Sequence, residues 1–365
     1  MSAPLLQVES LTKHFPLSPG ILSKNISVVR AVEDVSFSVS AGETLCIVGE
    51  SGCGKSTIAR LLMRLAEPTA GRVLIDGTDI AGLKRNALRA WRRRMQMVFQ
   101  DPYSSLNPRL NAGQIITEPV ENFERLSHKQ RKALAAELLR KVGMLPQVMD
   151  RFPSELSGGQ RQRLGIARAL ALQPSLIIAD EAVSALDVSV QAQILNLLMD
   201  LQQEMGIAYL FISHDLGVVE HIAHRVAVMY LGRIVELASS EALFAEAVHP
   251  YTEALIAAAP LPDPTRVRAS VTLEGEVPSP VKPPSGCAFH PRCPLALERC
   301  RVEVPPLVPM GDGRVVACHV RAPARVLGSA PGNANPSLTA GMPGSLHPIA
   351  NVQNTTNICT QHRAD

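Results

Sequence analysis

A short apolar run followed by a glycine-rich turn constrains the fold of this chain more than any other feature. Residues 45–48 (LCIV) indicate a buried strand, and the apolar positions of residues 58–65 fall at the spacing of one helix face. Between them, residues 49–57 have the sequence GESGCGKST, which matches the phosphate-binding pattern G-x-x-x-x-G-K-[ST]. The glycines let the backbone curl so that successive N–H groups point into one hollow, and the helix start adds its positive end.

This segment predicts a binding site for nucleotide phosphates. Lys55 can reach the β- and γ-phosphates, and the Ser56 hydroxyl can ligate Mg²⁺. A glycine-rich turn without a ligand is the alternative, but the strand and helix that a phosphate loop requires are both present. The residues expected to contact ATP here are Ser51, Gly52, Cys53, Gly54, Lys55, Ser56 and Thr57.

Short apolar runs alternate with helical patterns up to about residue 258. Residues 176–179 and 207–212 indicate two further strands, and the apolar positions of residues 190–205 indicate a helix between them. Residues 226–230 and 234–237 indicate a hairpin. Such alternation predicts an α/β fold built on a largely parallel sheet.

Polar side chains follow three of the apolar runs. Asp180 and Glu181 close the run 176–179, at the edge where open parallel sheets bind ligands. We expect Asp180 to hold Mg²⁺ through water and Glu181 to polarise the attacking water as general base. His214 and Gln100 each follow another run, and each alone is weaker evidence. The alternative for Asp180 and Glu181 is that the strand simply ends in two solvated acidic residues.

A second glycine-rich element precedes a predicted helix at residues 161–172. Residues 156–160 have the sequence LSGGQ, and a serine with two glycines at a helix start forms another receptor for phosphate. The residues expected to contact nucleotide here are Ser157, Gly158, Gly159 and Gln160.

Taken in order, these segments resemble the full motif set of ABC ATPases over roughly residues 5–240. The resemblance implies a P-loop nucleotide-binding domain with a helical subdomain. It also implies an ATP sandwich dimer, in which residues 49–57 of one subunit and 156–160 of the other enclose each nucleotide. One departure is visible, because Ala182 stands where the family usually has proline.

The same resemblance implies roles for individual residues. It makes Glu181 the catalytic base, His214 a contact of the γ-phosphate, and Gln100 a contact of Mg²⁺ and water that senses the membrane partner. It makes Phe15 the aromatic residue that stacks on adenine, with a core phenylalanine as the alternative, and Asp187 a bridge between the two subunits.

Further segments resemble the dipeptide/oligopeptide importer subfamily, and most of all its second ATPase subunit. They are residues 100–109 (QDPYSSLNPR), 249–252 (HPYT), 275–280 (GEVPSP) and 286–289 (GCAF), and the match continues to about His319. It implies an ATP-hydrolysing subunit at the cytoplasmic face of the inner membrane. The implied partners are a sister ATPase subunit, two transmembrane permease subunits and an extracytoplasmic peptide-binding protein. The cargo stays open among dipeptides, oligopeptides, glutathione and nickel.

The proline-rich part of the chain contains a group of cysteines. Twelve of residues 260–310 are proline, so long helices are not expected there. Four thiolates can hold a [4Fe–4S] cluster, and a segment with little regular structure needs a staple. Four unrelated buried thiols or a zinc site are the alternatives. The candidate ligands are Cys287, Cys293, Cys300 and Cys318.

Length, charge and hydropathy narrow the remaining choices. We expect an ABC ATPase domain at 1–258 with a helical subdomain at about 101–172, a small proline/cysteine-rich C-terminal region at 259–321, and a disordered tail at 322–365. A net charge of +3 gives no reason to expect a nucleic-acid partner. The sequence contains no run of 18 apolar residues, so no segment is expected to span a membrane. The N-terminus lacks a secretory signal, which favours the cytoplasm. A soluble ABC ATPase of translation or repair, or a redox-regulated ATPase, is the rival prediction.

Overall fold

The computed structural model describes residues 3–17, 27–259, 275–311 and 313–322. The chain divides into two units at residue 324, and every described residue belongs to the first. The predicted tail, apart from Ala322, lies outside the described residues. None of the described helices combines the length and the apolarity needed to cross a membrane.

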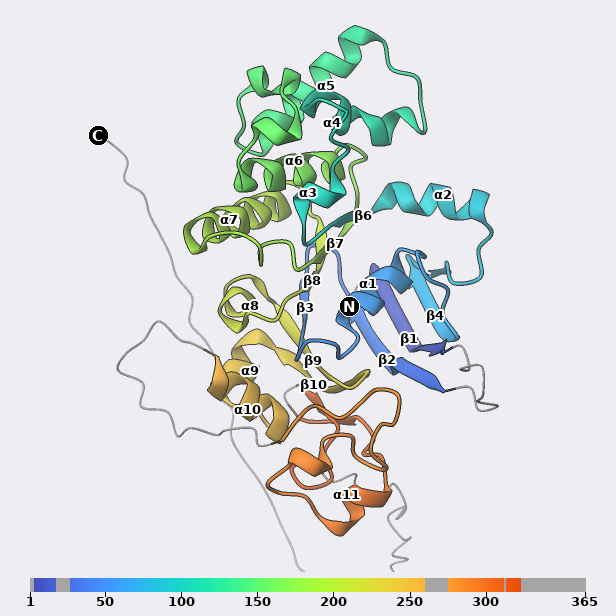
Figure 1. Cartoon of the computed structure of the whole chain (residues 1–365). Coiled ribbons are helices and arrows are strands. Elements are labelled where there is room, and N and C mark those ends of the chain that lie inside the picture. Colours follow the sequence, from blue (N-terminus) through green and yellow to red (C-terminus); the bar gives the residue numbers. More distant parts are fainter. Residues whose placement is uncertain (1–2, 18–26, 260–274, 312, 323–365) are drawn as a thin grey trace, which may run out of the picture. The chain divides into compact units, whose positions relative to one another are not determined.

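An eight-stranded sheet forms the centre of the described chain (Figure 1). Its five neighbouring strands β6, β7, β8, β3 and β9 pair in parallel, and three antiparallel strands extend it beyond β9. This confirms the predicted α/β fold with a largely parallel sheet. In spatial order the strands are β6 Met95–Val98, β7 Leu176–Asp180, β8 Ala208–Ile212, β3 Thr44–Val48, β9 Arg225–Tyr230, β10 Arg233–Ser239, β12 Val315–Val316 and β11 Val308–Pro309.

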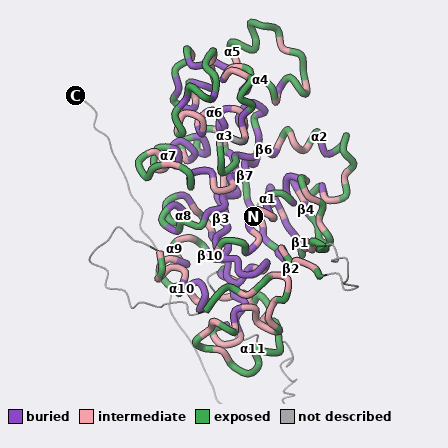
Figure 2. Tube along the Cα trace, viewed as in Figure 1, coloured by how far each residue is buried: buried purple, intermediate pink, exposed green. Residues whose placement is uncertain are grey.

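Side chains of the central sheet alternate between two hydrophobic clusters. In β3, Leu45 and Ile47 pack with helix α1 (Lys55–Leu62), whereas Cys46 and Val48 pack on the opposite face, and all four are fully buried. Figure 2 shows the buried residues concentrated along these strands. Because both faces are covered, the strands have continuous apolar sequences, which is the pattern that made them predictable.

A four-stranded antiparallel sheet covers the face that α1 occupies. Its order is β2-β1-β4-β5, and pattern analysis of the sequence did not identify it. The pairing of β1 with β2 shifts register three times, which breaks the regular alternation of apolar and polar residues. The strands are β1 Leu6–Pro16, β2 Val28–Val39, β4 Ala70–Ile75 and β5 Thr78–Asp79.

Helices cover the other face of the central sheet and extend beyond its β6 end (Figure 1). These helices are α3 Pro102–Ser105, α4 Ala112–Glu121, α5 His128–Lys141, the 3₁₀ helices η1 Pro146–Asp150 and η2 Pro153–Glu155, α6 Gly158–Leu170, α7 Val188–Met205 and α8 Leu216–Ile222. Helix α2, Arg85–Arg94, joins the antiparallel sheet to β6.

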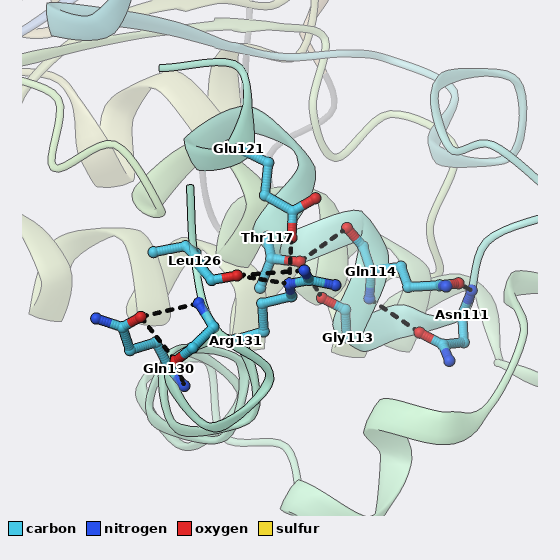
Figure 3. A network of polar contacts seen from close by, with 9 residues as sticks. Asn111, Gly113, Gln114, Thr117, Glu121, Leu126, Gln130 and Arg131 are labelled. Atoms are coloured by element: carbon cyan, nitrogen blue, oxygen red, sulfur yellow. Dashed lines mark hydrogen bonds and ion pairs between the residues drawn. The ribbon is translucent and has the colours of Figure 1, made fainter. Parts of the chain in front are cut away.

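Polar contacts fix the corner between α4 and α5 (Figure 3). A capping box begins each helix, with Asn111 and Gln114 at α4 and Ser127 and Gln130 at α5. The Arg131 guanidinium donates to the Leu126 carbonyl at 3.2 and 3.3 Å and pairs with Glu121 of α4 at 2.8 Å. These contacts set how the two helices meet.

The proline-rich segment contains only short elements within its described part, as expected. They are the 3₁₀ helix η3 His290–Arg292, helix α11 Glu298–Val302 and strands β11 and β12. They follow α9 (Ser240–Ala245) and α10 (Pro250–Ala258). Strand β12 pairs with β10, so the C-terminal region completes the central sheet.

A buried ion pair anchors this region. Glu236 of β10 is fully buried, and its carboxylate accepts from Arg314 at 3.1 Å and from the backbone N–H groups of Val248 and His249 at 3.0 and 2.9 Å. Arg314 also donates to the Ala242 carbonyl at 2.9 Å. Removing either charge would leave the other buried without its partner, which typically costs about 3–5 kcal/mol.

His249 makes the stability of this region depend on pH. Burial lowers the pKa of His249 from 6.5 to about 4, and its Nδ1 accepts from the Tyr251 N–H at 3.1 Å. As the pH falls below 6.5, the unfolded chain takes up the proton before the folded chain does. The stabilisation is therefore complete above pH 6.5 and is lost toward pH 4, by at most about 3 kcal/mol.

We therefore expect the thermal midpoint to fall between pH 7 and 4.5, and His249→Asn to flatten that dependence, because asparagine keeps the cap acceptor but does not titrate. The exposed His221, replaced by asparagine, is the matched control. Equal pH dependence in the native chain and His249→Asn would refute this role.

Candidate functional site

Glycines at positive φ shape the turn between β3 and α1. Gly49 has φ 150° and Gly54 has φ 107°. A Cβ on Gly54 would lie 2.1 Å from the Ala31 carbonyl oxygen, and one on Gly49 would lie 2.2 Å from that of Met229. Both positions therefore require glycine, for conformation and for space.

Lys55 opens α1 at the carboxyl end of β3. Its side chain is buried, and its ammonium donates to the carbonyl of Gly49 at 2.7 Å and to that of Glu50 at 3.0 Å. The charge is thus held inside the turn, beside the N–H groups at the start of the helix. A fixed positive charge beside the N–H groups of a helix start suits a phosphate.

Two oxygen-bearing side chains meet beside Lys55. The Ser56 hydroxyl donates to Asp180 Oδ1 at 2.9 Å, and Asp180 ends β7. Burial raises the pKa of Asp180 above its usual range, while the hydrogen bond from Ser56 opposes that shift. A desolvated carboxylate next to a hydroxyl is a donor set that suits Mg²⁺.

The three predicted catalytic residues also come together. The Gln100 amide donates to Glu181 Oε2 at 2.7 Å, and His214 Nδ1 lies 3.2 Å from Glu181 Oε1. Glu181 has φ 50°, unusual for a residue other than glycine, and its N–H donates to the Ile212 carbonyl at 2.9 Å. A carboxylate fixed between an amide and an imidazole can orient a water molecule.

Most of the phosphate-loop residues, together with Gln100 and Glu181, line one cavity of about 470 Å³. The predicted residues that line it are Phe15, Ser51, Gly52, Gly54, Lys55, Ser56, Thr57, Gln100 and Glu181. Phe15 is 38% exposed, and the Lys13 ammonium lies 4.8 Å from the centre of its ring, so it is not a core phenylalanine. Sequence reasoning missed Val29, Ala31 and Pro280, which also line the cavity.

Cys53 differs from the other predicted loop residues. Its side chain is 3% exposed, and burial raises the pKa of its thiol. It packs with Ile58 and Met229 in the cluster beneath the antiparallel sheet. Its thiol therefore fills the core, and only its backbone can face a phosphate.

The LSGGQ segment lies elsewhere. Ser157 caps α6, and its hydroxyl accepts from the Gln160 N–H at 3.3 Å. Among the described residues, none of 157–160 lines the 470 Å³ cavity. A Cβ on Gly159 would lie 2.6 Å from Val190 of α7, so the glycine lets the two helix starts approach. Asp187 is exposed at that same start of α7.

Helix α10 and the C-terminal region both contact the phosphate loop at Glu50. The Glu50 N–H donates to the Tyr251 hydroxyl at 2.9 Å, and Arg292 donates to both Glu50 carboxylate oxygens at 2.8 and 3.0 Å. Sequence reasoning missed Arg292 and gave Tyr251 no role beyond the resemblance. Contacts across such separations leave no local pattern in the sequence.

The predicted [4Fe–4S] site is not supported. Within the described ranges, no three His, Cys, Asp or Glu side chains are placed to hold a metal ion. Cys300 Sγ accepts from the Leu297 N–H and Cys318 Sγ from the Arg321 N–H, each at 3.4 Å. Burial raises the pKa of Cys287 to about 11, which keeps its thiol protonated, and burial also raises the pKa of Cys293. Cys300 and Cys318 thus accept hydrogen bonds in local turns, and Cys287 and Cys293 pack against the main hydrophobic cluster.

Comparison with known proteins agrees with this site. The ABC transporter family profile matches residues 32–184, and the profile of the oligopeptide/dipeptide transporter C-terminal region matches residues 235–300. The fold and site thus define an ABC-type ATPase.

Solved structures support that class. The dimeric post-hydrolysis ATP-binding cassette MJ0796, bound to ADP and phosphate, is 29% identical over 64% of this chain and 98% of its own, with a TM-score of 0.58. The cbiO1 protein of Clostridium perfringens, part of the cbiONQ transporter complex, is 27% identical over 67% of this chain and 92% of its own, with the same TM-score.

Curated relatives narrow the class. The probable peptide ABC transporter ATP-binding protein y4tS of Sinorhizobium fredii is 80% identical over 89% of this chain and 92% of its own length. The di/tripeptide transport ATP-binding protein DppF of Pseudomonas aeruginosa is 50% identical over 86% of this chain and 97% of its own length. The oligopeptide transport ATP-binding protein AppF of Bacillus subtilis is 49% identical over 87% of this chain and 97% of its own length. The chain therefore belongs to the ATP-binding subunits of peptide ABC transporters.

Proposed function

We propose that this chain energises the import of dipeptides or oligopeptides through a membrane ABC transporter. The observation that carries the proposal is the junction of the phosphate loop with Glu181, which lies between Gln100 and His214. A loop alone would bind nucleotide, but a fixed carboxylate beside it supports hydrolysis. Relatives whose names include peptide transport or peptide import support the cargo class.

The contacts support a division of roles among the predicted residues. Lys55 and the N–H groups of the loop would hold the β- and γ-phosphates. Ser56, Asp180 and Gln100 would hold Mg²⁺, which would neutralise charge that develops on the transferred phosphoryl group. Glu181 would take the proton of the attacking water, and His214 would contact the γ-phosphate.

The adenine would stack on Phe15. Its exposed ring stands on β1 at the rim of the 470 Å³ cavity, and Lys13 lies over it. A purine offers a flat face that matches this ring.

The position of the LSGGQ segment supports a two-chain site. Ser157, Gly158 and Asp187 are exposed, and the adjoining Val188 is 82% exposed. Because these residues flank one surface away from the chain's own cavity, we propose that they meet the nucleotide held by a sister ATPase subunit. The solved dimer of MJ0796, whose name records bound ADP and phosphate, agrees with such an arrangement.

A groove beside α2 supports contact with a membrane partner. It encloses about 790 Å³ between α2 and α4, and Arg85, Arg89 and Arg92 line it. Arg168, also in its wall, donates to the Ser105 carbonyl at 2.6 Å, which connects the groove to the segment after Gln100. We propose that one of two transmembrane permease subunits docks here at the cytoplasmic face of the membrane. An extracytoplasmic peptide-binding protein would deliver peptide to the permeases.

The same proposal fixes the parts of the chain. The ATPase domain would occupy residues 1–258, with the helical subdomain at about 101–172, and the C-terminal region would occupy 259–321. The order of elements supports these bounds, because helices α3 to α6 all fall within the proposed helical subdomain at about 101–172.

Two serines with the same local structure give a matched test of the two-chain site. Ser157 and Ser127 each cap a helix through a box with glutamine. In the transporter assembled with its membrane and sister subunits, we expect Ser157→Glu to lower ATP hydrolysis about a hundredfold, because it sets a negative charge against the triphosphate. Ser127→Glu should retain activity, and neither variant should change ATP binding by the isolated subunit.

Two outcomes would overturn the proposal. Full activity of Ser157→Glu in the assembly would contradict the two-chain site. Purification of the native chain from its own cells without any membrane subunit would instead favour a soluble ABC ATPase of translation or repair. Peptide uptake by those cells, with and without the chain, measures the cargo class directly.

A further inference from the structure

The C-terminal region reaches the first turn of the phosphate loop. We propose that Arg292 and Tyr251 are positioning residues of the ATP site, which hold Glu50 so that the loop keeps the conformation that binds the triphosphate. The inference rests on the proposed function in one respect, the assignment of residues 49–57 as the phosphate cradle. It adds that this cradle depends on contacts from Tyr251 of α10 and from Arg292 of the C-terminal region.

All three polar groups of Glu50 are engaged. Its carboxylate accepts two hydrogen bonds from Arg292, its N–H donates to the Tyr251 hydroxyl, and its carbonyl accepts from the Lys55 ammonium at 3.0 Å. The Cys53 N–H also donates to the Glu50 carbonyl, at 3.3 Å. The peptide groups on both sides of Glu50 therefore have fixed orientations, and Lys55 is fixed with them.

The ion pair has the geometry of a rigid contact. Two parallel hydrogen bonds join a planar guanidinium to a carboxylate, so rotation of either group breaks one of them. The Arg292 side chain is 5% exposed and that of Glu50 is 24% exposed, which limits screening by solvent. An exposed pair would tolerate movement, but a buried one loses most of its energy when it is misaligned.

Aromatic packing holds the two positioning residues in place. The rings of Tyr230, Tyr251 and Phe289 lie 4.7 to 5.4 Å apart, centre to centre, and all three are buried. Tyr230 ends β9, the neighbour of β3, and the Arg292 guanidinium lies 6.0 Å from its ring. The contacts to Glu50 thus come from α10 and η3, and Tyr230 packs both against the central sheet.

The energetic consequence concerns binding more than chemistry. Arg292 and Tyr251 bond the loop and not the Gln100–Glu181–His214 group, so they act on the substrate and the transition state alike. Losing such uniform binding raises KM and leaves kcat unchanged. A residue that merely holds the C-terminal region in place would instead lower the thermal midpoint and leave the KM of the folded fraction unaltered.

The test measures Mg-ATP binding and steady-state hydrolysis with the full chain, alone and in the assembled transporter. We expect Arg292→Gln to raise the Kd and KM for ATP about tenfold, which equals about 1.4 kcal/mol, with kcat within about twofold of native. Arg292→Lys keeps the charge but loses the paired hydrogen bonds, so an intermediate effect is expected. Arg299→Gln breaks an exposed ion pair between Arg299 of α11 and Glu303, which follows that helix, and should leave KM unchanged.

Tyr251→Phe is a second variant for the same test, and it is needed if Arg292→Gln does not fold. It keeps the packing of the aromatic ring. It removes only the acceptor of the Glu50 N–H, and we expect the KM for ATP to rise. Tyr209→Phe is its control, because the Tyr209 hydroxyl is buried without a hydrogen-bond partner among the described residues.

The outcomes separate this inference from the proposed function. A native chain that does not bind Mg-ATP would defeat both. A native chain that binds, together with Arg292→Gln and Tyr251→Phe variants that bind equally well, would defeat this inference alone. A lower thermal midpoint with native KM would assign the contacts to stability only.

Discussion

Replacing Glu181 by glutamine is expected to lower ATP hydrolysis about 10²–10⁴-fold and to leave ATP binding intact. Glutamine keeps the shape of the side chain and can still contact Gln100 and His214, which lie 2.7 and 3.2 Å from the carboxylate oxygens. It cannot accept the proton of the attacking water. Steady-state phosphate release by the assembled transporter, with nucleotide binding measured in parallel, checks both halves of the expectation.

Glu204→Gln is the matched control for this change. Glu204 is exposed, pairs with Lys141 at 2.6 Å and does not line the cavity, so its substitution should not alter turnover. Native hydrolysis by Glu181→Gln would show that another group takes the proton.

Replacing Lys55 by alanine is expected to weaken ATP binding about a hundredfold or more, because a charge-assisted contact to the phosphates is lost from a buried position. The loop would also lose the bonds that Lys55 donates to the carbonyls of Gly49 and Glu50. Calorimetric titration of the full chain with Mg-ATP measures the effect.

Lys141→Ala removes an equal charge from a half-buried position outside the cavity and serves as the control. Thermal midpoints of both variants would separate lost affinity from lost folding. If folded Lys55→Ala bound ATP as tightly as the native chain, residues 49–57 would not be the phosphate site.

Sequence patterns predicted the elements whose burial is two-sided and local. Strands β3, β7 and β8 were identifiable because their residues are almost all buried and therefore apolar without interruption. The antiparallel sheet was missed because register shifts in β1 interrupt its alternation. Strand β12 has two residues, too few for any periodicity, and its position depends on β10, which lies far away in the sequence.

The site divides in the same way. Lys55, Ser56, Asp180 and Glu181 belong to short motifs whose chemistry is visible in a few consecutive residues, and the structure brings them together. Arg292 could not be found so, because its partner Glu50 is 242 positions away. The cysteine spacing predicted proximity but not a metal site. Cys287 lies within electrostatic reach of Cys293, Cys300 and Cys318, yet no three His, Cys, Asp or Glu side chains of the described residues are placed to hold a metal ion.

The pairing of β12 with β10 also affects how the protein is made. On the β10 side of the central sheet, the two outer strands β12 and β11 come from residues 308–316, so β10 has no outer neighbour until residue 316 has left the ribosome. The sheet therefore finishes folding only after residue 316 has been added, and until then the exposed edge of β10 is open to pairing with other chains.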